Sequence, residues 1–145
     1  MAVVGYRGLV GRVTQAFEQS SRVLLINNKA IAVSCRDSRS GAVGILEWER
    51  GNHFRLEYVG REEDVTAGDT LLTSGLGRLF PEGFPVGIVT QVSTEPGNLS
   101  RRIGVVAMAD LYKLEELFIV VSGEGWDAEA AFEELERRGE EGETP

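Results

Sequence analysis

Cysteine, histidine and proline are scarce in this 145-residue sequence, which has one cysteine, one histidine and four prolines. A single cysteine excludes an internal disulfide and a thiolate metal cluster, and a single histidine excludes a histidine-rich metal site. Cys35 lies in an apolar alternation, which predicts a small buried side chain and not a reactive thiol. No loop has the acidic spacing of a carboxylate metal site, so we expect no metal and no cofactor.

Basic charge and long apolar runs are also scarce. Lysine and arginine number 15 against 23 aspartates and glutamates, which gives a formal net charge of -8. Phosphates require a basic surface, so this balance argues against nucleic acid as a partner. No stretch approaches the roughly 20 apolar residues that cross a bilayer, and the first residues lack the pattern of a signal peptide.

The sequence instead contains many short β-type segments separated by turn residues. Its 18 glycines and 42% hydrophobic residues fit a folded, turn-rich domain. Alternation and β-favouring content predict strands over residues 9–15, 22–26, 31–36, 42–48, 53–59, 70–73, 86–92, 103–108 and 117–121. Asp110 is expected to cap one helical turn before the last of them. The pattern predicts an all-β fold with two small antiparallel β-units.

The stretch 65–92 is a glycine- and proline-rich corner between two of these strands. Proline fixes φ and lacks a backbone donor, so Pro81 and Pro85 are expected in a loop or at a strand's first residue. The residues predicted to shape this corner are Gly68, Asp69, Thr73, Ser74, Gly75, Pro81, Gly83, Pro85, Val86 and Gly87. Phe80 and Phe84 lie on the connection itself, which makes them the candidate partner interface.

One segment of this corner is repeated elsewhere in the chain. The sequence VGRVTQ at 10–15 recurs as VGIVTQ at 86–91, an offset of 76 residues. The match favours two similar β-units, and in each copy the glycine, Gly11 or Gly87, is expected to allow close approach of a neighbouring strand.

A charged run at residues 61–64 suggests a boundary between the two units. We predict a strand remnant at 1–7 that belongs to the second barrel, a first β-barrel at 8–60, a second β-barrel at 61–122, and a helix with a disordered acidic tail at 123–145. Asp127 is a suitable N-cap for that helix, and Phe132 is expected to pack on the body.

A catalytic interpretation requires a nucleophile, a base and an orienting acid. The available groups are Ser74 or Ser34, His53, and one of the aspartates Asp37, Asp64 and Asp69, as in a hydrolase on a two-barrel, protease-like fold. The segment around Ser74 is not a nucleophile elbow, because Leu72 stands where a glycine is needed. We predict no catalytic residues and keep the hydrolase, and an accessory ligand-binding β-module, as alternatives.

Two motifs of the corner carry a resemblance to a known family. GDTLLTSGLG at 68–77 and FPEGFPVGIV at 80–89 resemble the signature of the bacterial rod-shape-determining MreC family, and GLVGRV at 8–13 with SRVLLI at 21–26 resembles that family's upstream segment. The similarity covers residues 3 to about 122. It implies two roughly six-stranded β-barrels, one of them incomplete here, with a short C-terminal helix.

The resemblance also implies a function and partners. Family members are non-catalytic extracytoplasmic (periplasmic) scaffolds of the cell-elongation machinery, which organise peptidoglycan-synthesising enzymes to maintain rod shape. Implied partners are the elongation-specific penicillin-binding transpeptidase, MreD, RodA and MreB, together with self-association. The family's N-terminal stub, membrane helix, coiled coil and first strands have no counterpart here. We therefore expect membrane contact only through an anchor absent from this chain, and an unpaired strand edge that promotes association.

Overall fold

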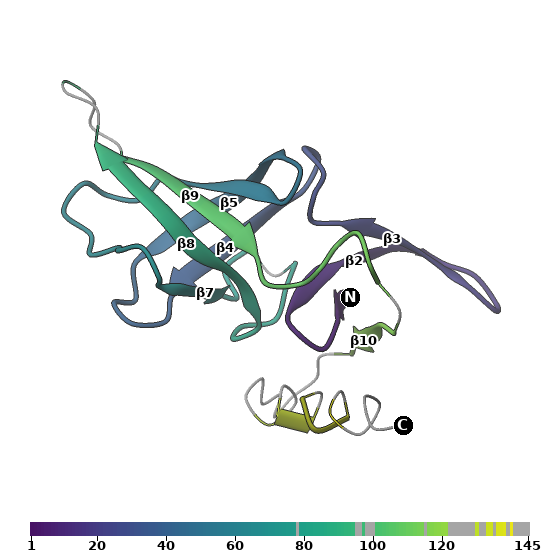
Figure 1. The fold of residues 1–145 in the computed structure, drawn as a ribbon. Helices are drawn as coiled ribbons and strands as arrows, with labels where there is room; N and C mark the ends of the chain where they lie inside the picture. The colour runs from purple at the N-terminus through teal and green to yellow at the C-terminus, as the bar shows by residue number, and fades with distance from the viewer. Residues whose placement is uncertain are drawn as a thin grey trace.

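The structure, a computed structural model, describes residues 1–77, 79–94, 97, 101–114, 116–121, 130, 133–134, 136–138 and 140. Within these residues the fold is nearly all β, as predicted (Figure 1). Its strands are β1 (Ala2–Val4), β2 (Leu9–Ala16), β3 (Ser21–Leu25), β4 (Ala32–Asp37), β5 (Val43–Arg50), β6 (His53–Glu57), β7 (Thr70–Thr73), β8 (Pro85–Thr94), β9 (Arg101–Ala107) and β10 (Phe118–Val120).

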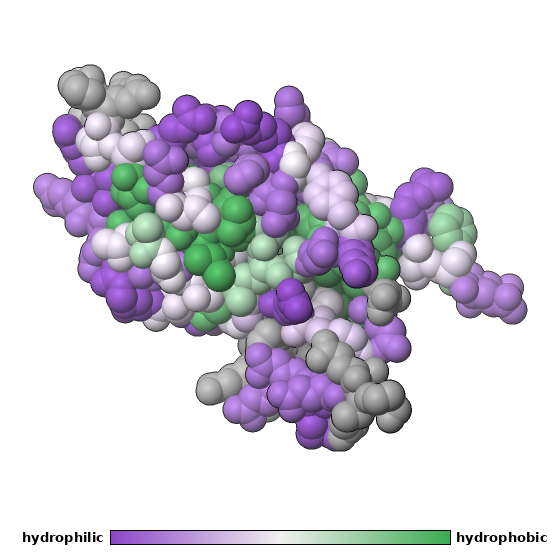
Figure 2. Space-filling view, in the orientation of Figure 1, coloured by the Kyte–Doolittle hydropathy of each residue, from purple (hydrophilic) through white to green (hydrophobic). Residues whose placement is uncertain are grey.

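Six strands form a closed antiparallel barrel in the order β4-β5-β6-β9-β8-β7. In β4, β6 and β9 alternate residues are buried, which is the pattern of a strand with one face in a core. The inward side chains are apolar and closely packed, for example Val33, Phe54 and Val105 at 1% exposure each. The outer surface of β8 and β9 also carries an apolar patch, seen at the left of Figure 2.

The other four strands form an open sheet in the order β10-β1-β2-β3. The central strand β1 is fully buried and pairs with β10 through Ala2 and Val120, from opposite ends of the described chain. Among the residues described, β3 and β10 each have a strand partner on one side only. The hairpin of β2 and β3 extends away from the rest of the molecule (Figure 1).

The barrel and the open sheet share one hydrophobic core. The cluster of buried residues runs from Val3 and Val10 in the sheet to Leu71 and Val86 in the barrel without a break. At the junction the backbone of Gly8 lies so close to β8 that an added Cβ would be 2.6 Å from the carbonyl oxygen of Pro85. A glycine is required there because no side chain fits the gap.

The predicted repeat is confirmed by strand register. Val3 pairs with Gly11 as Leu71 pairs with Gly87, and Gly11 pairs with Leu25 as Gly87 pairs with Ala107. The irregularity between Val13 and Gln15 in β2 recurs between Val89 and Gln91 in β8, at the same offset of 76 residues. β10, β1, β2 and β3 therefore correspond to β4, β7, β8 and β9.

The predicted boundaries do not follow the sheets. The closed barrel takes β4, β5 and β6 from the predicted first barrel (8–60) and β7, β8 and β9 from the second (61–122). β2 and β3, also placed in the first barrel, lie instead in the open sheet with β1 and β10. The physical reason is that β4 pairs with β7 and β6 with β9, so long-range ladders cross the charged run at 61–64 that was read as a boundary.

Smaller predictions have mixed outcomes. Cys35 is fully buried as predicted, and burial raises the pKa of its thiol. Asp110 caps a turn, accepting from the N–H of Tyr112 at 3.2 Å, but residues 111–114 form no helix. The described residues from 130 to 140 are helical, whereas Asp127, Phe132 and the tail from 141 lie outside the described residues. No helix in the described part of the chain is long and apolar enough to cross a membrane.

Candidate interaction site

Thr73, the last residue of β7, fastens the loop 74–84 that connects β7 to β8. Its hydroxyl is buried, donates to the carbonyl oxygen of Pro81 at 2.5 Å and accepts from the N–H of Phe84 at 2.9 Å. The Thr73 N–H donates to the carbonyl oxygen of Phe84 at 2.8 Å, and the Gly83 N–H donates to that of Thr73 at 2.9 Å. These bonds satisfy a buried hydroxyl and hold the two ends of the loop together.

Ser74 continues this attachment toward β4. Its N–H donates to the carbonyl oxygen of Ser34 at 2.9 Å, and its hydroxyl bonds to the Ser34 hydroxyl at 2.7 Å. Gly75 and Gly83 have φ values of 77° and 98°, in the left-handed region that favours glycine. The corner residues predicted from the sequence therefore shape and anchor the loop and bring no catalytic group into place.

The two aromatic residues predicted as a partner interface are not on the surface. Phe80 and Phe84 are 5% and 0% exposed, so that prediction does not hold in this structure. The bonds at Thr73 close the loop and turn both rings into the core. The exposed apolar side chains of the loop are instead Leu76 and Leu79, at 61% and 51%. The sequence gives no signal for this, because an irregular loop has no periodicity that says which apolar residue points outward.

A hollow of about 360 Å³ lies beside the loop, at its contact with the open sheet. It is lined by Met1, Ala2, Gly75, Leu79, Phe80, Pro81, Glu82 and Val120. Leu79 is thus both an exposed residue and part of a concave apolar surface. We call Leu76, Leu79 and this hollow the loop surface.

Asp69, at the turn before β7, is the centre of a charged cluster that the sequence did not reveal. Its carboxylate accepts from the Nε and one Nη of Arg39 at 2.9 Å each and from the N–H of Thr66 at 2.9 Å. Arg39 also donates to Asp64 at 2.6 Å. The hydrogen bonds from Arg39 hold the pKa of Asp69 well below its usual range. Gly68, with a φ of 95°, makes the turn that places Asp69 there.

Asp37, at the end of β4, is fully buried beside Asp69. One of its oxygens accepts from the N–H of Arg39 at 2.8 Å, and the other has no hydrogen-bond partner among the described residues. Burial raises the pKa of Asp37, and the neighbouring Asp69 raises it further. A protonated Asp37 can donate to Asp69, which gives the free oxygen a partner. Arg39 already fills the space between the carboxylates, so the cluster is a structural clasp.

The structure does not assemble the alternative hydrolase. His53 begins β6 and Ser74 follows β7, and in the barrel order β9 and β8 lie between these two strands. The Ser74 hydroxyl is bonded to Ser34, and Asp69 is held by Arg39. Among the residues described, no group of three or more histidine, cysteine, aspartate or glutamate side chains is arranged to hold a metal.

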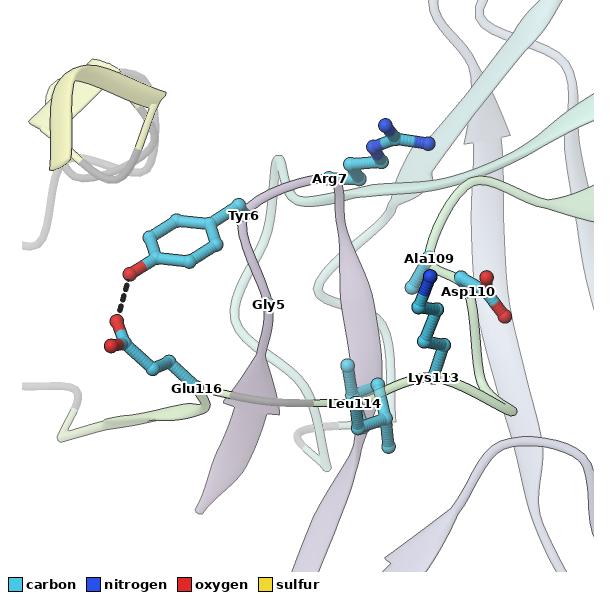
Figure 3. A pocket seen from close by; sticks show the side chains of 9 residues that line it. Gly5, Tyr6, Arg7, Ala109, Asp110, Lys113, Leu114 and Glu116 are labelled. Carbon is cyan, nitrogen blue, oxygen red and sulfur yellow. Dashed lines mark hydrogen bonds between the residues drawn. The ribbon is translucent and has the colours of Figure 1, made fainter. Parts of the chain in front are cut away.

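A second hollow, of about 390 Å³, lies where the β1–β2 turn meets residues 109–116 (Figure 3). Tyr6 and Glu116 point toward one another and are hydrogen bonded, while the side chain of Arg7 extends away from them. The ring of Tyr6 packs edge-on against Phe118 with centroids 5.4 Å apart. The polar groups of this hollow do not converge on one point, so it gives no support to a ligand-binding module.

A family model described as "Rod shape-determining protein MreC, barrel core" matches residues 1–121. The chain belongs to the MreC family. It is 32% identical over 120 residues to the cell shape-determining protein MreC of Escherichia coli, which covers 81% of this chain and 32% of that protein. The chain thus spans about a third of this MreC relative's length, and the signature predicted at 68–89 lies within the matched region.

Solved structures of MreC proteins have the same fold. The crystal structure of MreC from Pseudomonas aeruginosa matches with a TM-score of 0.72 and 30% identity, covering 76% of this chain and 72% of that one. The major periplasmic domain of the cell shape-determining filament MreC matches with a TM-score of 0.63 and 25% identity, over 74% and 68% of the two chains. A complex between the penicillin-binding protein PBP2 and MreC from Helicobacter pylori matches at 0.57 and 20%, over 73% and 64%, which shows the fold alone.

Proposed function

We propose that this chain is the barrel-bearing part of a non-catalytic scaffold in the bacterial cell-elongation machinery, where it organises peptidoglycan-synthesising enzymes to maintain rod shape. The observation that carries the proposal is the match of the MreC barrel core to residues 1–121, on a fold shared with MreC structures. The separation of Ser74 from His53 by two strands supports a non-catalytic role. By analogy with the solved periplasmic domain, the chain works on the extracytoplasmic side of the membrane, anchored elsewhere in the full-length protein.

The partner that we propose is the extracytoplasmic domain of the elongation-specific penicillin-binding transpeptidase. The complex of PBP2 with MreC from Helicobacter pylori supports this class of partner. MreD, RodA and MreB are proposed as further members of the same assembly on family resemblance.

The loop surface is the place where we propose that the transpeptidase binds. Leu76 and Leu79 are exposed apolar side chains beside a hollow, on a loop that Thr73 holds rigidly. Exposed apolar side chains beside a hollow are typical of binding surfaces, and a rigid loop loses little entropy on binding.

A binding titration with the purified transpeptidase domain tests this surface. The double variant Leu76→Glu with Leu79→Glu is expected to weaken binding at least tenfold, because it places two charges in an apolar contact. Phe17→Glu is the matched control, since Phe17 is 50% exposed but lies on the β2–β3 turn. Unchanged binding by a folded double variant would overturn the proposed surface. Absence of binding by the unmodified, folded chain would overturn the partner.

Self-association is proposed to use the two free edges of the open sheet. β10 is short and apolar, and Leu117, Ile119 and Val121 on its outer side are 38%, 46% and 73% exposed. A flat apolar edge strand can pair with another chain. Sedimentation velocity is expected to show association that increases with concentration, and one monomeric species across a wide range of concentrations would contradict it.

A further inference from the structure

The outer face of the barrel carries an apolar row that the loop surface does not use. Ile88 in β8 and Val106 in β9 are directly paired, with Thr70 of β7 beyond Ile88 and His53 of β6 beyond Val106. Ile88 is 36% exposed. This row lies under the apolar patch over β8 and β9 in Figure 2.

One end of this row meets a hollow that three distant parts of the chain enclose. The hollow measures about 370 Å³ and is lined by Tyr6, Arg7, Ile88, Ala107, Met108 and Glu136. Tyr6 and Arg7 come from the β1–β2 turn, Ile88 from the barrel, and Glu136 from the helical segment 130–140. The segment thus lies at the junction between the open sheet and the barrel, below the sheets in Figure 1.

Charges on the two sides of this junction are complementary. Arg7 is exposed and has no ion pair among the described residues, and Glu136 lies across the hollow from it. A second pair has the opposite order, with Glu116 on the body and Arg138 on the segment. The hydrogen bond to Glu116 raises the pKa of Tyr6, and the nearby positive charge of Arg138 acts in the other direction, which places Arg138 close to this residue.

The helical segment requires such a surface for its stability. Isolated helices shorter than about 12 to 15 residues are marginal in water. Within the segment Glu134 binds Arg137 at 2.6 Å and Arg138 at 2.9 Å, and exposed pairs of this kind contribute little. Packing against the body is therefore the main source of order available to it.

We propose that the surface formed by Arg7, Ile88, Ala107 and Met108 is a docking site for the chain's own helical segment 130–140. The opposed charge pairs, Arg7 with Glu136 and Glu116 with Arg138, set the direction in which the segment lies. The segment covers one end of the apolar row on the barrel. Any partner that uses this end of the row has to displace it.

Hydrogen exchange on the full chain tests the docking. Amides of residues 130–140 are expected to exchange at least tenfold more slowly than in an unstructured peptide. Arg7→Glu and Glu136→Arg are each expected to reduce this protection several-fold, because each places like charges across the hollow. The double variant restores the opposite charges and is expected to restore protection. Lys29→Glu is the control, an equal change of charge on the β3–β4 connection, which lies on the far side of the molecule from the segment (Figure 1).

Amides of β8 and β9, read in the same experiment, report whether each variant is folded. Unprotected amides at 130–140 in the unmodified chain would overturn the proposal. Protection that both single variants leave unchanged would overturn it as well. Protection that falls on dilution would assign the site to the segment of a second copy and overturn docking within one chain.

Discussion

The open sheet and the closed barrel contain the same four-stranded arrangement in two different states of completion. β10, β1, β2 and β3 pair in the register of β4, β7, β8 and β9, but only the second set is joined by β5 and β6 into a barrel. The consequence is visible at equivalent positions. Val105 in β9 is 1% exposed, whereas its counterpart Val23 in β3 is only half-buried. Strand pairing alone therefore does not create the core, because closure by the last two strands excludes water from it.

A second difference lies in the connections. The N–H of Gly5 donates to Gly8 at 2.9 Å, as the N–H of Thr73 donates to Phe84 at 2.8 Å. The offset between the two units is 68 residues before this bond and 76 residues after it, so loop 74–84 has eight more residues than the turn in the open sheet. The exposed residues Leu76 and Leu79 lie in this insertion. The repeated framework thus supports a surface that only one of the two units has.

The sharpest way to break the comparison is to place a methyl group at the two equivalent glycines. An added Cβ would be 2.6 Å from the carbonyl oxygen of Val106 at Gly87, and 2.1 Å from that of Leu24 at Gly11. β9 is held on both sides in the barrel, whereas β3 is an edge strand that can move away. Gly87→Ala is therefore expected to cost about 3 kcal/mol of unfolding free energy, near the upper end for overpacking, and Gly11→Ala less.

Chemical denaturation of both variants checks this order. The static distances alone predict the reverse, because the overlap is closer at Gly11. A larger loss for Gly11→Ala would show that the open sheet is as rigid as the barrel and that closure is not the controlling difference.

The next comparison removes side-chain volume at the equivalent valines. Val105→Ala opens a cavity in a closed core and is expected to cost about 2 kcal/mol, while Val23→Ala removes methyl groups from a half-buried site and is expected to cost less than about 1 kcal/mol. Both values come from urea denaturation with an unchanged m-value. Equal costs would mean that the face of β3 at Val23 is covered in solution, for example by another copy of the chain.

Much of this architecture follows from local sequence patterns. Alternation in segments such as 31–36 and 103–108 predicts strands because a sheet with one buried face needs a period of two. The repeated VG at 10–11 and 86–87 reveals the two units, since both glycines face a backbone carbonyl of the next strand. The grouping of strands into sheets was predicted wrongly, because β1 pairs with β10 and β4 with β7 over sequence distances that local patterns do not encode.

The candidate site was predicted less well than the fold. Glycine and proline identify the corner around Thr73, because their backbone preferences are local properties. Whether an apolar loop residue is buried depends on the hydrogen bonds of Thr73, which is why Phe80 is buried and Leu79 is exposed. The clasp between Arg39 and Asp69 is equally non-local, since thirty residues separate its two members.

The smallest expected effect concerns that clasp, which the open sheet lacks because Met1 stands at the position equivalent to Asp69. Arg39 holds the pKa of Asp69 below its ordinary value, so the clasp stabilises the fold above about pH 4 and is lost as the pH falls toward the folded-state pKa. Asp37 acts in the opposite direction, because burial raises its pKa and the folded state favours its protonated form. Asp69→Asn is expected to lower the thermal midpoint at pH 7 by a few degrees and to flatten its decline in acid, since Arg39 is half-exposed and screened.

Asp37→Asn is the matched variant, because an amide keeps an acceptor for the N–H of Arg39 and removes the buried charge. It is expected to keep or raise the midpoint at pH 7 and to differ little from the unmodified chain below about pH 4, where the ordinary aspartate is protonated. Hydrogen exchange as a function of pH compares the two units directly. Amides of β7 are expected to lose protection on acidification before those of β1, and simultaneous loss would show that the clasp does not stabilise the barrel selectively.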